Sequence, residues 1–191
     1  MERIAVVGVS GSGKSTVAGA VAARLGYRHV ELDSIHHQPD WEPIETEAFR
    51  QIVSEIAATD RWVIDGNYGS LVQDLVFDRA DTIVWLDLPR RVVMPAVTRR
   101  TLTRMALRTE LWNGNRERFR NLLDRRPEEN ILLWSWTNHG PVTERYTSQI
   151  ADPRYAAIVW VRLRSRREVS HWLDSLPRIG SHDGEQSEDV L

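Results

Sequence analysis

The chain has 191 residues and a formal net charge of −2, with 41% hydrophobic and 27% charged residues, values typical of one globular domain. No apolar run approaches the roughly 18 residues that cross a bilayer, and no signal peptide is evident, so we expect a cytoplasmic protein without a membrane partner. The sequence has no cysteine, which excludes disulfides, thiolate metal sites and a cysteine nucleophile.

The first half of the chain alternates apolar runs with amphipathic segments. Residues 3–9 form an apolar run ending near glycines, which predicts a strand buried on both faces. A helix is predicted over 14–25, because Val17 and Val21 recur every four residues and Gly26 follows as a stop. The next predicted elements are a strand at 29–32, a helix at 45–58, a strand at 61–65 and a helix at 70–77.

The second half continues the alternation. Its predicted elements are a strand at 82–86, a helix at 89–108, a helix at 115–136, a strand at 156–163 and a helix at 165–176. Pro95 should kink or restart the first of these helices. Strands separated by helices indicate an α/β fold with a mostly parallel, five-stranded sheet in three layers. We expect one domain over 1–176 and a disordered acidic tail over 177–191.

A phosphate-binding motif joins the first predicted strand to the first predicted helix. The segment 8–15 fits the pattern G-x-x-x-x-G-K-[ST], in which glycines let successive backbone N–H groups point at phosphate oxygens. Lys14 should reach the β- and γ-phosphates of ATP and take part in catalysis, and Ser15 should ligate Mg²⁺. The sequence has no other lysine. The predicted nucleotide-binding residues here are Gly8, Ser10, Gly11, Ser12, Gly13, Lys14, Ser15 and Thr16.

Two acidic residues follow predicted strands. Asp65 ends an apolar strand, as the Mg²⁺-organising acid of such proteins does, and is predicted as a metal ligand beside Ser15. Asp33 follows the second strand, at the sheet edge where ligands bind, and is predicted to be catalytic. Asp33 could take a proton from the acceptor, hold Mg²⁺ through water, or serve only as a turn residue. His36 and His37 follow it, without an evident third metal ligand.

Arginines concentrate in the segment 89–126, which has 11 arginines and three acids. Arg100, Arg104 and Arg108 fall four residues apart and should share one face of a helix. Such a stripe suits a lid that closes over phosphates and neutralises charge in the transition state. We predict Arg100 and Arg104 as catalytic residues, Arg104 and Arg108 as nucleotide-binding residues, and 99–126 as the lid.

These motifs, in this order, resemble the nucleoside-monophosphate-kinase branch of P-loop proteins. More narrowly, the sequence looks like the adenylate-kinase-related "DNA topology modulation protein" family, and the segments 62–68, 85–89 and 110–117 carry much of that likeness. The resemblance implies a three-layer P-loop NTPase fold of nucleoside-monophosphate-kinase type, with an ATP site and a helical lid. Adenylate kinase relatives have an arginine soon after the Asp65–Gly66 turn, and this chain has none at 67–70.

The leading interpretation is a kinase that moves the γ-phosphate of MgATP to a small-molecule acceptor. The segment 34–60, where the acceptor should enter, has Arg50 as its one arginine and many acids, so we expect a neutral or cationic acceptor rather than a nucleoside monophosphate. The alternative is an ATP-dependent regulatory or nucleic-acid-binding P-loop protein that uses 89–126 as a basic surface. A GTPase is disfavoured, because an Asn-Lys-x-Asp guanine-reading loop is absent.

Overall fold

The computed structural model describes residues 1–117, 119–127 and 129–177. All but the first residue of the predicted acidic tail lies outside this part of the chain. Within the described residues, no helix has the length and apolar character that a bilayer crossing requires.

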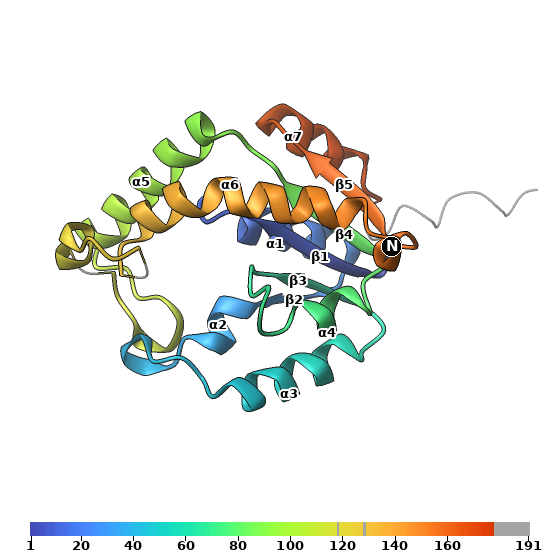
Figure 1. Ribbon diagram of the computed structural model, residues 1–191, viewed down its shortest axis with the longest axis horizontal. Coiled ribbons are helices and arrows are strands. Elements are labelled where there is room, and N and C mark those ends of the chain that lie inside the picture. The colour runs from blue at the N-terminus through green and yellow to red at the C-terminus, as the bar shows by residue number, and fades with distance from the viewer. Residues whose placement is uncertain (118, 128, 178–191) are drawn as a thin grey trace, which may run out of the picture.

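Five strands form one sheet in the order β2-β3-β1-β4-β5, and all neighbouring pairs are parallel (Figure 1). The carboxyl ends of the strands therefore meet at one edge of the sheet. The strands are β1 (Arg3–Gly8), β2 (Arg28–Glu31), β3 (Trp62–Asp65), β4 (Thr82–Leu86) and β5 (Val159–Leu163). The predicted α/β fold with a five-stranded parallel sheet is confirmed.

Helices cover both faces of the sheet and extend beyond its carboxyl edge (Figure 1). The α-helices are α1 (Lys14–Leu25), α2 (Leu32–His36), α3 (Thr46–Ala57), α4 (Gln73–Phe77), α5 (Arg90–Ala106), α6 (Ile131–Ile150) and α7 (Arg166–Ser175). Short 3₁₀ turns lie at η1 (Pro39–Trp41), η2 (Trp112–Gly114), η3 (Phe119–Leu123) and η4 (Pro153–Tyr155).

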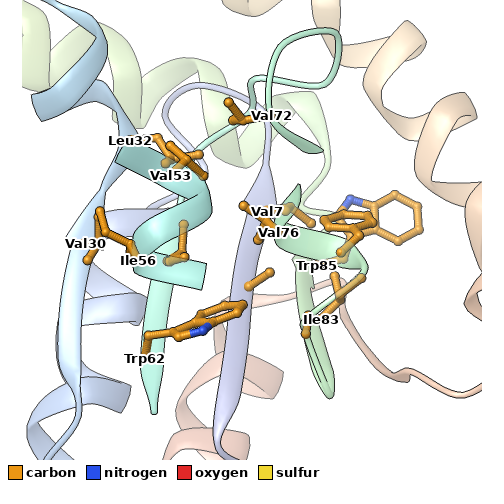
Figure 2. Packing of buried hydrophobic residues seen from close by; sticks show 14 of the residues in the cluster. Val7, Val30, Leu32, Val53, Ile56, Trp62, Val72, Val76, Ile83 and Trp85 are labelled. Carbon is orange, nitrogen blue, oxygen red and sulfur yellow. The ribbon is translucent and has the colours of Figure 1, made fainter. Parts of the chain in front are cut away.

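The central strands β1, β3 and β4 are buried on both faces because alternate side chains enter two separate hydrophobic clusters. Along β1, Ile4 and Val6 pack with α1 and α7, whereas Ala5 and Val7 pack with α3, α4 and α6. Figure 2 shows part of the second cluster, in which helix α3 lies over the strand that carries Trp62. This packing fixes the carboxyl ends of β1, β2 and β3, where the predicted functional residues lie.

The predicted helix at 115–136 is wrong over most of its length. The described residues between 107 and 130 form turns and 3₁₀ segments, and no α-helix is present among them. Pro127 lacks an N–H for a helical hydrogen bond, and Asn130 begins α6 by accepting hydrogen bonds from the N–H groups of Leu132 and Leu133. Helix α6 then continues through Gly140 and Pro141.

Other predicted boundaries shift by a few residues. Helix α5 runs without a break through Pro95 and ends at Ala106, two residues before the predicted end. The short helix α2 was not predicted; it begins immediately after β2 and contains Asp33.

Candidate active site

The phosphate loop curls between β1 and α1 around glycines with positive φ angles, at 84° for Gly11 and 97° for Gly13. These values fall where glycine is favoured because it has no β-carbon. Helix α1 starts at Lys14, so the N–H groups of its first turn have no partner inside the helix and its positive end faces the loop. The cradle fits the phosphate chain of ATP as the sequence predicts.

Lys14 points inward from this loop. Its Nζ donates a hydrogen bond to the backbone oxygen of Val9 at 3.3 Å. Burial lowers the pKa of the Lys14 ammonium, and the charges of Asp33 and Asp65 oppose that shift, whereas the charge of Arg100 adds to it. The lysine therefore lies among the acids and the arginine that the sequence singles out.

Three distant segments contact the phosphate loop, and the sequence analysis predicts none of these contacts. A β-carbon on Gly11 would lie 2.6 Å from the Cβ of Val97 in α5. The Ser135 hydroxyl of α6 donates to the backbone oxygen of Ser10 at 2.8 Å. Arg166, at the start of α7, donates from NH1 to the backbone oxygen of Ser12 at 3.2 Å. The loop is held from three sides.

Ser15 and Asp65, the two residues predicted as metal ligands, lie in direct contact. The Ser15 hydroxyl donates to Oδ1 of Asp65 at 3.1 Å, and the carboxylate is 3% exposed. The other carboxylate oxygen lies 2.7 Å from Nε2 of His29 on β2, and this hydrogen bond raises the pKa of His29. A hydroxyl and a carboxylate are oxygen ligands of the kind Mg²⁺ prefers, so the pair fits that ion. Thr16, in contrast, is exposed.

Asp33 lies on α2, close to Lys14 and Arg100. Its Oδ1 accepts a hydrogen bond from the Tyr68 hydroxyl at 2.7 Å. The Tyr68 oxygen also lies 3.4 Å from Nε2 of His37. The surroundings of Asp33 are thus a lysine, an arginine and a half-buried tyrosine.

The predicted arginine stripe is only partly present. Burial and the neighbouring charge of Arg104 lower the pKa of the Arg100 guanidinium, which faces Glu117 and Asp33. Arg104 forms an ion pair with Glu117 at 3.2 Å. Arg108 lies beyond the end of α5, exposed and with a φ of 48°, so it does not share the helical face of the other two. Its predicted placement on that face is wrong.

The segment 112–117 docks on the segment 31–41. The Asn115 amide donates to the backbone oxygen of Gln38 at 2.8 Å and accepts from the N–H of Trp41 at 2.9 Å. Asn113 donates to the backbone oxygen of His37, and the Trp112 indole donates to Glu31 at 3.2 Å. Two parts of the chain about 75 positions apart are thus hydrogen-bonded around the site.

The acids of the segment 34–60 do not gather at this site. Each is exposed, which agrees with a position on the outer surface of the segment; they are Asp40, Glu42, Glu45, Glu47, Glu55 and Asp60. Arg50 is held by a two-armed ion pair with Asp74, at 2.8 and 3.1 Å. Neither His36 nor His37 belongs to a cluster of three potential metal ligands among the described residues.

Arg145 of α6 is a further cation near the loop that follows β3, and the sequence analysis does not predict it. A β-carbon on Gly69 would lie 2.3 Å from the NH1 of Arg145, so the guanidinium rests against the loop that follows β3. Within the described residues, Arg145 has no carboxylate partner, and its buried Nε has no hydrogen-bond partner. Neighbouring Tyr146 donates to the side chain of Asn67 in the same loop.

Comparisons with known proteins agree with this geometry. No family model matches the chain. It is 30% identical over 138 residues to shikimate kinases of Synechococcus elongatus and a second Synechococcus strain, covering 60% of this chain and 70% of each relative. The fold matches shikimate kinase from Bacteroides thetaiotaomicron (TM-score 0.51, 17% identity, 91% of this chain and 94% of that one). It also matches shikimate kinase from Acinetobacter baumannii in complex with shikimate (TM-score 0.50, 17% identity, 91% of this chain and 89% of that one).

The sequence relatives are ATP-dependent kinases, and the phosphate loop, the buried acid at the end of β3 and the parallel sheet are the parts such an enzyme needs. The chain therefore belongs to the shikimate kinase family of P-loop kinases.

Proposed function

We propose that the protein transfers the γ-phosphoryl group of MgATP to a hydroxyl group of a small molecule that is not a nucleoside monophosphate. The observation that carries the proposal is the position of Asp33, which lies near Lys14 and Arg100 with one carboxylate oxygen already bound by Tyr68. A carboxylate at that place can accept the proton of an attacking hydroxyl.

The nucleotide side of the reaction follows from the phosphate loop. The backbone of residues 8–13 and the first turn of α1 bind the phosphates, and Lys14 neutralises charge on the β- and γ-phosphates. Ser15 and the carboxylate of Asp65 would hold Mg²⁺, with Thr16 beside them. When bound, Mg²⁺ supplies positive charge to the phosphate oxygens.

The transfer step uses residues from two elements, α2 and α5. The acceptor oxygen forms a bond to the γ-phosphorus, the bond to the β-phosphate oxygen breaks, and ADP leaves with that electron pair. The hydroxyl proton passes to Asp33. Arg100 and Arg104 stabilise the charge that spreads over the transferred group.

The segments 99–117 and 119–126 serve as the lid in this proposal, and 34–60 forms the acceptor side. Lid closure would exclude water from the phosphates. We assign Arg108 to the nucleotide through lid movement alone, because its position beyond α5 gives it no contact with the loop. The motif at 112–117 supports placing the chain on the adenylate-kinase-related "DNA topology modulation protein" branch of these kinases.

The arginines near the acceptor-side segment 34–60 limit the charge that the acceptor can carry. Gripping a dianionic phosphate takes paired arginines. Arg50 is occupied by Asp74, and 67–70 has no arginine, which together argue against a nucleoside monophosphate. We therefore favour a neutral or cationic alcohol. Arg145 could balance a single negative charge, so an alcohol with one carboxylate is a third class of acceptor beside neutral and cationic alcohols. Shikimate, which the names of the relatives suggest, is the first member of this class to test.

A coupled assay of ADP release tests the proposal with three groups of acceptors. These are neutral polyols and amino alcohols, hydroxy acids including shikimate, and the nucleotides AMP, CMP, GMP, UMP and dTMP. We expect acceptor-dependent turnover in one of the first two groups, and none with Lys14→Ala as the blank. Phosphorylation of any nucleotide at a micromolar to low-millimolar KM would refute the assignment of the acceptor.

A further inference from the structure

A hydrogen-bonded chain of three side chains ends on Asp33. The Tyr68 hydroxyl lies 2.7 Å from Oδ1 of Asp33 and 3.4 Å from Nε2 of His37. The three residues come from α2, the position just after α2 and the loop after β3, so they are brought together only by the fold.

The direction of the protons in this chain follows from the chemistry of the three groups. Burial, reinforced by the charge of Asp33, raises the pKa of Tyr68, so its single proton stays on the hydroxyl and points at the carboxylate. Burial lowers the pKa of His37, which keeps the ring neutral. With the tyrosine proton committed to Asp33, the His37 ring can only donate to the tyrosine oxygen, from an N–H at Nε2.

The second ring nitrogen of His37 agrees with this assignment. Nδ1 is buried and has no hydrogen-bond partner among the described residues. A buried N–H without a hydrogen-bond partner costs more free energy than a buried nitrogen lone pair without one, because the N–H is a strong donor. A neutral ring with its proton on Nε2 leaves the lone pair on Nδ1.

The surroundings hold Tyr68 and His37 in place. The Tyr68 ring packs against His36, with ring centroids 4.6 Å apart, and meets Phe49 edge-on at 5.3 Å. On the lid side, the His37 ring stacks on Trp112 at 6.1 Å, and its backbone oxygen accepts from Asn113. The chain thus runs from the lid segment to the acceptor-side carboxylate.

We propose that Tyr68 and His37 are positioning residues for Asp33 in the phosphoryl transfer. Their hydrogen bonds occupy Oδ1, fix the rotation of the carboxylate, and leave Oδ2 to receive the acceptor hydroxyl. This inference rests on the proposed role of Asp33 as the proton acceptor. Because His37 also contacts Trp112 and Asn113, docking of the lid segment completes the arrangement.

Three variants test whether the two positioning residues affect the rate of phosphoryl transfer. Water and millimolar shikimate are the probe acceptors of the γ-phosphoryl group of MgATP. Tyr68→Phe removes only the hydroxyl, and we expect turnover to fall about tenfold while KM for MgATP stays within about twofold. His37→Gln keeps a donor near Nε2 and should retain most turnover, whereas His37→Asn cannot reach and should behave like Tyr68→Phe. The control is Tyr27→Phe. Its hydroxyl donates to the Met1 backbone oxygen at 3.3 Å, and Tyr27 lies before β2, at the opposite end of that strand from Asp33.

If Tyr68 and His37 only stabilised the fold, all three variants would lose turnover to a similar extent and their KM for MgATP would change as well. Equal loss of turnover in His37→Gln and His37→Asn would overturn the proposal. Wild-type turnover in Tyr68→Phe would also overturn it, as would a rise in the KM of Tyr68→Phe for MgATP as large as its fall in turnover. Asp33→Asn separates the two levels of the argument. If Asp33→Asn turns over like the wild type, the proposed role of Asp33 fails. If Asp33→Asn is inactive while Tyr68→Phe turns over like the wild type, only the positioning role fails.

Nitrogen-15 NMR of histidine needs no acceptor and therefore decides the matter even if neither probe is phosphorylated. We expect His37 to be neutral at pH 7 with its proton on Nε2, and its Nε2 signal to move in Tyr68→Phe but not in Tyr27→Phe. A proton on Nδ1, or a signal that ignores Tyr68→Phe, would overturn the proposed chain.

Discussion

Removing the side chain of Asn115 should free the lid segment from the acceptor side. In the wild type, this side chain is buried, with 4% of the residue exposed, and it makes two hydrogen bonds to the backbone of the segment 38–41. Asn115→Ala deletes both bonds and leaves the oxygen of Gln38 and the N–H of Trp41 to find water.

The size of the effect follows from those two bonds. Each contributes about 1 kcal/mol net, and a buried group left unpaired costs about 1–3 kcal/mol. Both backbone groups can regain water once the segments separate, so we take the low end, about 2 kcal/mol for the pair. That corresponds to roughly a 30-fold fall in the docked-to-open ratio, since 1.4 kcal/mol is a factor of about ten.

Hydrogen exchange gives the direct measurement, because the Trp41 amide is itself the donor to Asn115. We expect that amide to exchange about 30-fold faster in Asn115→Ala, with smaller gains at 112–117. Asn138→Ala is the matched control, since Asn138 bonds only within α6 and to its neighbour Thr137. Trp41 exchange within about threefold of the wild type would show that the docking does not depend on Asn115.

Three further predictions concern the nucleotide side. Lys14→Ala should keep the fold, judged by circular dichroism, but lose acceptor-dependent ADP release by about a hundredfold or more; wild-type turnover would contradict the proposed role. Asp65→Asn should weaken the Mg²⁺ dependence of nucleotide binding, and overlapping Mg²⁺ titrations would make Asp65 a structural residue only. Gly11→Ala should weaken ATP binding at least tenfold, because its β-carbon would meet Val97 at 2.6 Å. Gly114→Ala has a similar positive φ but open space around it, and equal ATP affinity in the two would contradict this reasoning.

The parts of the site that the sequence predicts are those encoded locally. The phosphate loop needs one strand, one turn and one helix in succession, and the motif specifies all three. Asp33 and Asp65 follow apolar runs, and parallel strands bring such ends to one edge of the sheet. These features depend on period and spacing, which are visible in a single sequence.

The parts that the sequence analysis missed depend on contacts between distant segments. Tyr68, Arg145 and Arg166 lie in a loop and at helix positions that periodicity alone would class as ordinary packing or surface. The predicted helix at 115–136 contains Pro127, which has no N–H to donate inside a helix, and Asn130, a residue type favoured as an N-cap. Together these two residues mark a helix start near 130, where α6 begins.

The single lysine has a practical consequence for chemistry on this protein. Apart from the terminal amine, Lys14 supplies the one primary amine of the sequence, and burial lowers the pKa of that amine. An amine-directed acylating reagent therefore has one internal target, at the point where the phosphates bind. Isotope-labelled lysine would likewise give one side-chain resonance, which reports nucleotide occupancy without any assignment of the spectrum.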